Sequence, residues 1–207
     1  MTALRRFGPS ALLRTGLFAP LAALSLAGCG LNSVPTAEEN VTAKWGQVQS
    51  EYQRRADLIP NLVATVKGYA QQEKDVLAEV TNARASASRV QLNAGDLSDP
   101  AKVRAFSDAQ SQLGGSLSRL LVTMEAYPDL KSNQNFLTLQ SQIEGTENSI
   151  LVSRKDYNEA VQAYNTRIRT FPDAIGAKIF YGAKPKVPFE AASGAQTAPK
   201  VDFDSAP

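Results

Sequence analysis

The sequence of 207 residues contains no histidine and a single cysteine, Cys29. Without histidine, the commonest general acid–base residue is missing, so histidine-based catalysis and the usual zinc sites are excluded. One cysteine cannot form a disulfide within the chain. Aromatic residues make up only 7% of the sequence, but a hydrophobic content of 43% is enough for the core of one globular domain.

The formal net charge of +2 is unevenly distributed along the chain. Arg5, Arg6 and Arg14 precede Cys29, and no acidic residue lies in that segment. The remaining chain has 19 Lys and Arg against 20 Asp and Glu, which is a net charge of −1. The basic balance therefore belongs to the N-terminal segment, and it gives no support to nucleic-acid binding.

Residues 1–28 have the organisation of a secretory signal peptide, with basic residues, an apolar stretch from about Thr15 to Ala27 and then small residues. The apolar stretch is shorter than the roughly 20 residues that span a bilayer. Its last residues and the next one, Leu26-Ala27-Gly28-Cys29, resemble the lipobox of bacterial lipoproteins. In such proteins the chain is cut before the cysteine, and the thiol carries a diacylglycerol. An ordinary signal peptide with a chance cysteine is the alternative.

The lipobox resemblance implies that residues 29–36 comprise a lipidated cysteine and a spacer, and that a membrane is the first partner of the protein. Several acyl chains, at about 0.8 kcal/mol for each buried methylene, anchor a protein far better than a single myristoyl chain does. Gly30 follows the cysteine. By resemblance to proteobacterial lipoproteins, it stands where an aspartate would retain the protein in the inner membrane. The expected location is therefore the cell envelope, facing the periplasm, with the outer membrane favoured.

The body of the chain has a helical pattern. Between Glu38 and Phe171, apolar residues recur every three or four positions, and no strand pattern of any weight occurs. Pro60 predicts a break or kink around Leu58–Asn61, because proline lacks the N–H that a helix needs. The positions expected to face the core are Val41, Trp45, Val48, Tyr52 and Ile59, then Leu62, Val63, Val66, Ala70, Leu77, Val80 and Ala87, then Val103, Phe106, Leu113, Leu117, Leu120, Leu121 and Met124, then Phe136, Leu139, Ile143, Ile150, Tyr157, Val161, Tyr164, Ile168 and Phe171.

Four such helices with short connections predict an all-α fold, an up-and-down antiparallel four-helix bundle with a long C-terminal helix. Ser98-Asp99-Pro100 has the pattern of a helix start, with a capping residue followed by proline in the first turn. The bundle is expected to occupy residues 37–182. Residues 183–207, which from about Pro185 are rich in Pro, Ala, Gly and Ser, are expected to form a flexible tail.

Several blocks of the sequence carry a family resemblance. The longest runs from Tyr52 to Val63 as Tyr-Gln-Arg-Arg-Ala-Asp-Leu-Ile-Pro-Asn-Leu-Val, after Trp45. The others are residues 66–70, 125–130 and 154–158, followed by Tyr164-Asn165 and Phe171-Pro172. Over roughly residues 32–203 the chain resembles the LemA family. The resemblance implies a membrane-anchored, mostly helical domain outside the cytoplasm, and it implies no activity, because the family has no established biochemical function.

The sequence departs from the family pattern at two positions. Leu31 stands where many members have tyrosine, and Gln72 stands where many have histidine before Glu73. The second departure argues against a histidine-dependent chemistry shared with those members.

Two acids and two arginines fall on the predicted apolar faces: Arg55, Glu73, Glu147 and Arg154. A buried charge costs several kcal/mol unless it is paired and hydrogen-bonded, so these residues are expected to pair. Depth along the helices predicts two clusters of a structural buried polar network. They are a mid-bundle cluster of Glu73, Glu147 and Arg154, and a near-turn cluster of Arg55, Asp57, Glu125 and Asp129.

The carboxylates admit other interpretations. A di-metal site in a helical bundle needs Glu-x-x-His motifs, and a calcium loop of the usual pattern is absent from the sequence. No metal and no cofactor is therefore predicted. General acid–base catalysis would need a cleft that reaches the carboxylates. The favoured interpretation is that the charges fix the register and topology of the helices.

Tyr157-Asn158 and Tyr164-Asn165 lie seven residues apart, so the pair repeats on one helical face. The tyrosines are expected to be core residues with hydroxyls at the rim, and a recognition patch formed by all four residues is the alternative.

The sequence thus favours a non-enzymatic envelope lipoprotein that binds or scaffolds unidentified envelope proteins. The alternative is an enzyme or enzyme accessory that acts on cell-wall or lipid material through Glu73 and Glu147. The oligomeric state is left open.

Overall fold

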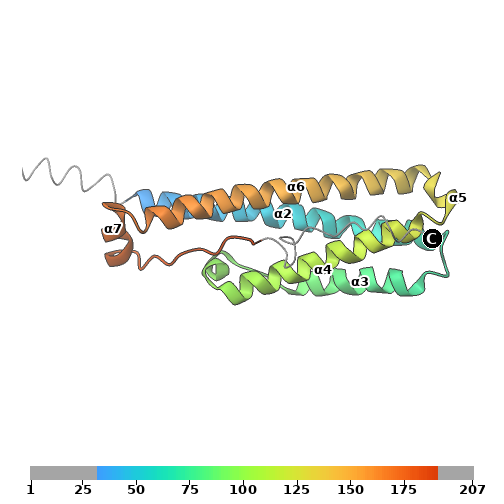
Figure 1. Cartoon of the computed structure of the whole chain (residues 1–207), viewed down its shortest axis with the longest axis horizontal. Helices are drawn as coiled ribbons and strands as arrows, with labels where there is room; N and C mark the ends of the chain where they lie inside the picture. Colours follow the sequence, from blue (N-terminus) through green and yellow to red (C-terminus); the bar gives the residue numbers. More distant parts are fainter. Residues whose placement is uncertain (1–31, 191–207) are drawn as a thin grey trace, which may run out of the picture.

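The computed structural model describes residues 32–190, so the predicted signal peptide, Cys29 and residues 191–207 of the predicted tail lie outside the described residues. Within residues 32–190 every regular element is a helix, which confirms the all-α prediction. Four long helices run side by side and alternate in direction (Figure 1). They are α2 (Ser33–Lys67), α3 (Lys74–Arg89), α4 (Pro100–Met124) and α6 (Gln134–Arg167). The shorter elements are η1 (Ala94–Ser98), α5 (Pro128–Lys131) and α7 (Asp173–Ile179).

The interior consists of two hydrophobic clusters arranged one after the other along α2 and α6. The aliphatic core lies towards α5 and contains Ile59, Leu62, Val66, Ala70, Leu77, Val80, Ala83, Ala87, Leu113, Leu117, Leu120, Met124, Leu130, Phe136 and Ile143. The aromatic core lies towards α7 and contains Val34, Val41, Trp45, Val48, Tyr52, Leu92, Leu97, Val103, Phe106, Ile150, Tyr157, Ala160, Val161, Tyr164, Ala177 and Phe189. Most positions expected to face the core are buried, and the clear exception is Phe171, which is 82% exposed.

Of the break or kink predicted at Pro60, the break is wrong, because α2 continues through Pro60 to Lys67. Proline supplies no N–H to the carbonyl oxygen of Ala56, one turn earlier in the helix. That oxygen instead accepts a hydrogen bond of 2.8 Å from Nε of Arg84 on α3. A side chain from the neighbouring helix thus replaces the missing donor, and the turn between α2 and α3 falls at residues 68–73.

The predicted start of α4 is confirmed. Pro100 is its first residue, and the Asp99 carboxylate accepts hydrogen bonds from the backbone N–H groups of Ala101 and Lys102. These contacts satisfy two of the donors that a helix start leaves free.

The prediction of a flexible tail from residue 183 is wrong for residues 183–190, which we call the strap. The strap runs in extended conformation from α7 back along the helices (Figure 1). Its Val187 donates a backbone hydrogen bond of 2.8 Å to Leu97 of η1, and its Phe189 is buried. Of the helices in residues 32–190, none combines the length and the apolar character needed to cross a bilayer.

Candidate functional site

Arg55 lies where the two cores meet, and it is the only charged side chain that is fully buried within residues 32–190. Its Nη1 donates to Oε1 of Glu147 on α6 over 2.6 Å. Its Nη2 donates to the side-chain and main-chain oxygens of Gln110 on α4, over 2.8 Å and 3.1 Å. Its guanidinium carbon lies 5.2 Å from the centroid of the Tyr52 ring. One side chain of α2 is therefore bonded to both α4 and α6.

The acceptors around Arg55 offset the cost of removing its charge from water. The Glu147 side chain is 42% exposed, so the ion pair opens to solvent on the α6 side. A Cβ atom at Gly114 would lie 3.6 Å from Nη1 of Arg55, an ordinary van der Waals contact, so α4 passes directly beside the guanidinium. The arrangement ties three helices at one level.

Tyr52 lies between Arg55 and a second arginine, Arg154, which is nearer to the strap. Burial raises the pKa of the Tyr52 hydroxyl, and the positive charges of Arg154 and Arg55 oppose that effect. Arg154 itself donates from Nη2 to the main-chain oxygen of Glu190 over 3.0 Å, and its guanidinium lies 4.7 Å from the centroid of the Phe189 ring. Arg154 thus binds the strap.

The predicted mid-bundle cluster of Glu73, Glu147 and Arg154 is wrong. Glu147 pairs with Arg55, and Arg154 holds the strap. Glu73 accepts a hydrogen bond of 2.7 Å from the Tyr127 hydroxyl and lies just before α3. This hydrogen bond is the main reason why the pKa of Tyr127 is raised. Because α2 does not break at Pro60, Glu73 lies at the turn rather than at mid-depth.

The predicted near-turn cluster of Arg55, Asp57, Glu125 and Asp129 is also wrong. Asp57, Glu125 and Asp129 are exposed. The Asp57 carboxylate accepts a hydrogen bond from Gln53 of the same helix over 2.7 Å. Within residues 32–190, no three acidic or cysteine side chains are grouped so that they could hold a metal ion.

Two asparagines of α6 bind the strap through paired hydrogen bonds. The amide of Asn165 donates to the main-chain oxygen of Lys186 and accepts from its N–H, both over 2.8 Å. The amide of Asn158 makes the same pair with Phe189, over 2.9 Å and 2.8 Å. Seven helical residues rise about 10.5 Å, and three extended residues span about 10 Å. The Asn158–Asn165 spacing therefore matches the spacing of the two strap residues.

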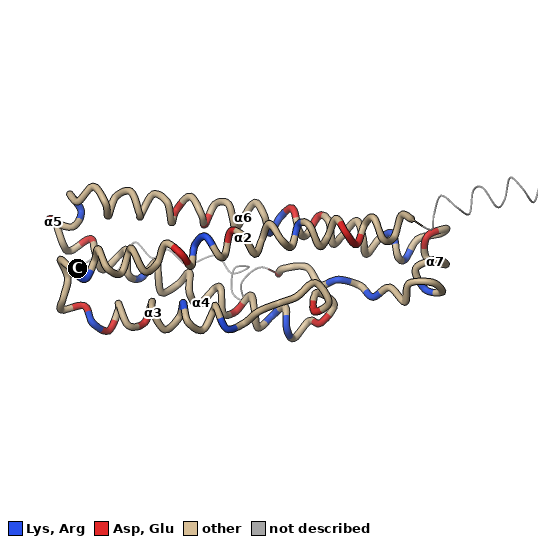
Figure 2. The backbone as a smooth tube through the Cα atoms, turned by 180° about the vertical axis from the view of Figure 1, so that it is seen from behind, with Lys and Arg blue, Asp and Glu red and all other residues tan. Residues whose placement is uncertain are grey.

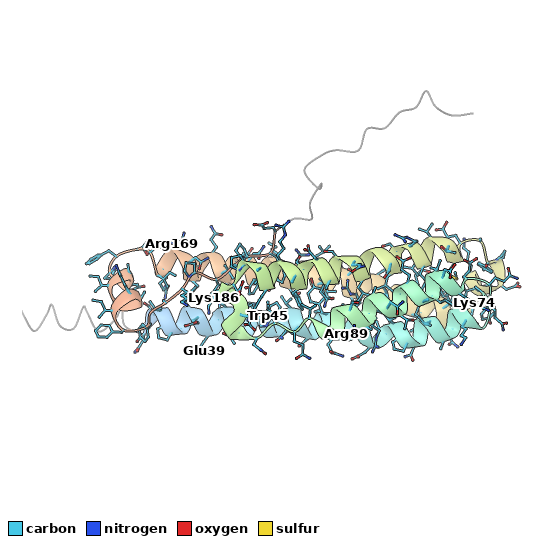
Figure 3. All side chains as sticks on the ribbon, turned by 90° about the horizontal axis from the view of Figure 1, so that it is seen from below. Glu39, Trp45, Lys74, Arg89, Arg169 and Lys186 are labelled. Carbon is cyan, nitrogen blue, oxygen red and sulfur yellow. The ribbon has the colours of Figure 1, made fainter. Side chains whose placement is uncertain are left out.

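Aromatic rings enclose the end of the strap. The Phe189 ring centroid lies 5.3 Å from that of Tyr157, 6.1 Å from that of Trp45 and 6.4 Å from that of Phe106. The Tyr157 hydroxyl donates to the main-chain oxygen of Val187 over 3.0 Å. Figure 3 shows Trp45 and Lys186 in this part of the molecule. The strap is thus part of the fold, and its Phe189 packs against rings of α2, α4 and α6.

Tyr157, Asn158, Tyr164 and Asn165, the residues of the alternative recognition patch, therefore face the protein's own chain. Both tyrosines are fully buried, and both asparagines bind the strap. Beside the strap, a surface pocket of about 430 Å³ is lined in part by Asn158, Asn165 and Pro188.

Three of the residues that complete these contacts were not predicted from the sequence: Gln110, Lys186 and Phe189. Gln110 falls on the apolar stripe of α4, between Phe106 and Leu113, which was a usable signal for a buried polar partner. Phe189 stands two residues after Val187, which is the alternation of an extended segment packed on one face.

Comparisons with known proteins place this architecture in a family. The model of the LemA family matches residues 44–203. Magnetosome proteins MamQ 1 and MamQ 2 of Paramagnetospirillum magneticum are each 26% identical to the chain over 157 residues, which cover 68% of this chain and 58% of theirs. Protein LemA of Metamycoplasma hominis is 25% identical over 124 residues, which cover 60% of this chain and 52% of that protein.

The matched region thus spans little more than half the length of these curated relatives. The family match nevertheless covers most of this chain and nearly all of its described helices. The chain belongs to the LemA family.

Proposed function

We propose that the protein is a lipoprotein of the cell envelope, a non-enzymatic binding or scaffolding module held on a membrane by lipid on Cys29. The observation that carries the proposal is the position of Cys29, which ends the lipobox-like Leu26-Ala27-Gly28-Cys29 and lies only four residues before Ser33, where α2 begins. An extended chain spans at most about 3.5 Å per residue, so the anchor would lie within about 14 Å of the helical domain.

The shape of the domain suits a scaffold. The 35 residues of α2 rise about 50 Å at 1.5 Å per residue, and α6 has a similar length. A domain tethered next to α7 would place α5 about 50 Å from the anchor if it stood upright on the membrane. A lipid tether also raises the effective concentration of the domain towards envelope partners. The relatives named as magnetosome proteins fit a membrane-associated role.

The partners of the acidic residues Glu73 and Glu147 favour a binding role over a catalytic one. The rival proposal, an enzyme or enzyme accessory for cell-wall or lipid material, depends on an acidic centre of Glu73 and Glu147. These two residues have different partners, Tyr127 near the turns and Arg55 between the cores. The rival is therefore left without its proposed centre.

The first experiment is mass spectrometry of the protein purified from its native membrane, in parallel with a Cys29→Ala variant. We expect a chain that begins at Cys29 and carries lipid, and a variant that stays uncut or leaves the membrane. An unmodified chain that begins elsewhere would contradict the lipid anchor. Crosslinking in intact cells with the wild-type protein, and with the Cys29→Ala variant as control, would then identify envelope partners.

The proposed outer-membrane location rests on Gly30, and separation of the two membranes by density tests it. We expect the protein in the outer-membrane fraction and a Gly30→Asp variant in the inner-membrane fraction. Wild-type protein in the inner-membrane fraction would contradict this location while leaving the lipid anchor intact.

A further inference from the structure

The segment around α7 exposes an unusual amount of apolar surface. Ten large hydrophobic side chains are exposed within residues 32–190, and five of them lie between residues 171 and 181. Their exposed fractions are 82% for Phe171, 52% for Ile175, 68% for Ile179, 67% for Phe180 and 43% for Tyr181. Single exposed apolar residues are ordinary, but a local cluster of this kind marks an interaction surface.

The orientation of α7 is fixed by its other face. Gly176 and Ala177 are buried, and Ala177 belongs to the same core cluster as Val34 at the start of α2. Ile175 and Ile179 are four residues apart, so they lie together on one side of the helix. The packing of α7 on α2 therefore directs this apolar side away from the protein.

Neighbouring contacts hold α7 in this position. Arg167, at the end of α6, donates to the main-chain oxygen of Ser33 over 3.3 Å and pairs with Asp173 over 3.7 Å. The same side chain therefore binds the first residue of α2 and the first residue of α7. Figure 1 shows α7 at the end of the molecule from which α2 starts.

The segment that contains α7 is also positively charged. Residues 167–186 contain five Lys and Arg against one Asp, a net charge of +4, whereas the chain from Cys29 onward has a net charge of −1. Lys186 pairs with Glu38 and Arg167 with Asp173. The other three cations of this segment are exposed and have no ion-pair partner among the described residues: Arg169, Lys178 and Lys184. Figure 2 shows cations on α7 and on the segment after it, and Figure 3 shows Arg169 at this end.

We propose that this end of the molecule is a membrane-contact surface, with Phe171, Ile175, Ile179 and Phe180 inserted at the lipid interface and Arg169, Lys178 and Lys184 facing anionic headgroups. The proposal rests on the lipid anchor proposed above, because the chain leaves the described domain towards Cys29 at this same end. Exposed apolar side chains surrounded by cations are the combination that binds the interface of an anionic bilayer. The surface would give the tethered domain a defined orientation, with α2 and α6 directed away from the membrane.

Tryptophan fluorescence tests the contact. The protein has a single tryptophan, Trp45, which is 2% exposed and provides a constant background. Phe180→Trp adds a probe within the proposed surface. Val122→Trp adds the matched control at a position that is 67% exposed on α4, near the opposite end of the molecule. Both variants would be purified as lipidated protein and reconstituted into phosphatidylethanolamine–phosphatidylglycerol vesicles, with and without brominated phospholipid.

We expect brominated lipid to reduce the emission of the tryptophan at position 180 about two-fold, because a ring inserted at the interface lies within a few ångströms of the headgroups. The emission of the tryptophan at position 122 should be unchanged. Equal quenching of the two probes, or none, in protein that floats with the vesicles would overturn the membrane contact while leaving the anchor intact. Protein that does not float would overturn the anchor, and the contact with it.

Lipid composition provides a second readout on the same surface. Replacing phosphatidylglycerol with phosphatidylcholine, or introducing R169Q, K178Q and K184Q together, should weaken the quenching at position 180 without changing flotation. Quenching that is unchanged by both treatments would overturn the role assigned to the three cations.

Discussion

The two cores of this protein are filled by different kinds of side chain. Four helices enclose the aliphatic core, where Phe136 is the only buried aromatic ring among the described residues. The aromatic core lies between α2, α6 and the first turns of α4, with η1 and the strap in place of α3. Trp45 and Tyr157 there fill volume with their rings and also donate to main-chain oxygens, those of Leu92 and Val187. Large rings with polar atoms can therefore pack irregular backbone where a helix is missing.

Truncation in the aliphatic core should have the largest effect on stability. Leu120 is completely buried in it. We expect Leu120→Ala to lower the free energy of unfolding by about 3 kcal/mol, because the site loses transfer energy and keeps part of the cavity. Urea unfolding followed by circular dichroism measures this change. Val122→Ala, two residues away on the same helix and 67% exposed, is the control and should change stability little. Equal effects of the two substitutions would show that α4 does not pack as described.

Removing the acid that pairs with Arg55 should have the next largest effect. Glu147→Ala leaves the buried guanidinium without its counter-charge, and we expect a loss of about 2 kcal/mol. The loss is smaller than for a fully buried pair because the Glu147 side chain is 42% exposed. Glu144→Ala, on an exposed position of the same helix, is the control. Identical melting temperatures for the two variants would mean that the ion pair contributes nothing to joining the cores.

Much of this arrangement could be predicted from the sequence. The spacing of apolar residues identified the helical segments, and it identified buried positions such as Ile59, Leu113 and Tyr157. Asp99-Pro100 identified the start of α4. These features depend on local chemistry, that is, on helical periodicity and on the donors at a helix start, so a single sequence is sufficient to reveal them.

The pairing of charges could not be predicted, because it depends on a long-range contact. Pro60 predicts a helix end, whereas α2 continues and Arg84 of α3 bonds the Ala56 oxygen that Pro60 leaves without a donor. A helix end at Pro60 predicts that Glu73 lies well along the second helix, at the same depth as Glu147. Because α2 does not end there, Glu73 lies at the turn instead. The strap was missed for a related reason. Its proline-rich composition is typical of a tail, whereas it is held by contacts with distant residues, among them Asn158 and Asn165, more than twenty residues earlier.

Loss of one asparagine should release the strap with a moderate effect. Asn165→Ala removes both hydrogen bonds to Lys186, and we expect a loss of about 1.5 kcal/mol. The amide of Lys186 should then exchange its hydrogen faster, while the amides of the aliphatic core keep their protection. Hydrogen exchange read by mass spectrometry measures both. Asn148→Ala, at an exposed position on the same helix, is the control. If protection of the strap were the same in both variants, the asparagines would not be what holds it.

A smaller effect is expected from the Tyr157 hydroxyl. Tyr157→Phe keeps the ring in the aromatic core and removes the hydrogen bond to Val187. We expect a loss of about 1 kcal/mol, the usual net contribution of one such bond. Thermal unfolding of Tyr157→Phe beside wild-type protein measures it. A variant as stable as the wild type would mean that the Tyr157 hydroxyl does not contribute to holding the strap.

The smallest effect at neutral pH is expected for Tyr164. This residue is also buried, but its hydroxyl has no hydrogen-bond partner among the described residues, so Tyr164→Phe should leave stability unchanged or slightly increased near pH 7. A difference in stability between Tyr164→Phe and the wild type should appear at alkaline pH. Burial, with a contribution from the negative charge of Glu38, raises the pKa of Tyr164 from 10.0 to about 12.

The folded protein therefore holds this proton more tightly than the unfolded chain does. The contribution to stability is fully present below pH 10 and is lost as the pH rises from 10 towards 12. Phenylalanine has no such proton, so the stability of Tyr164→Phe should fall less steeply in this range. The fall that remains reflects the other tyrosines whose pKa is raised in the folded protein, Tyr157 and Tyr52 among them. Urea unfolding at neutral pH and at about pH 11 measures the divergence. Parallel curves for variant and wild type would mean that the Tyr164 hydroxyl reaches solvent, and the aromatic core would then be less tightly closed beside the strap than the aliphatic core is between its four helices.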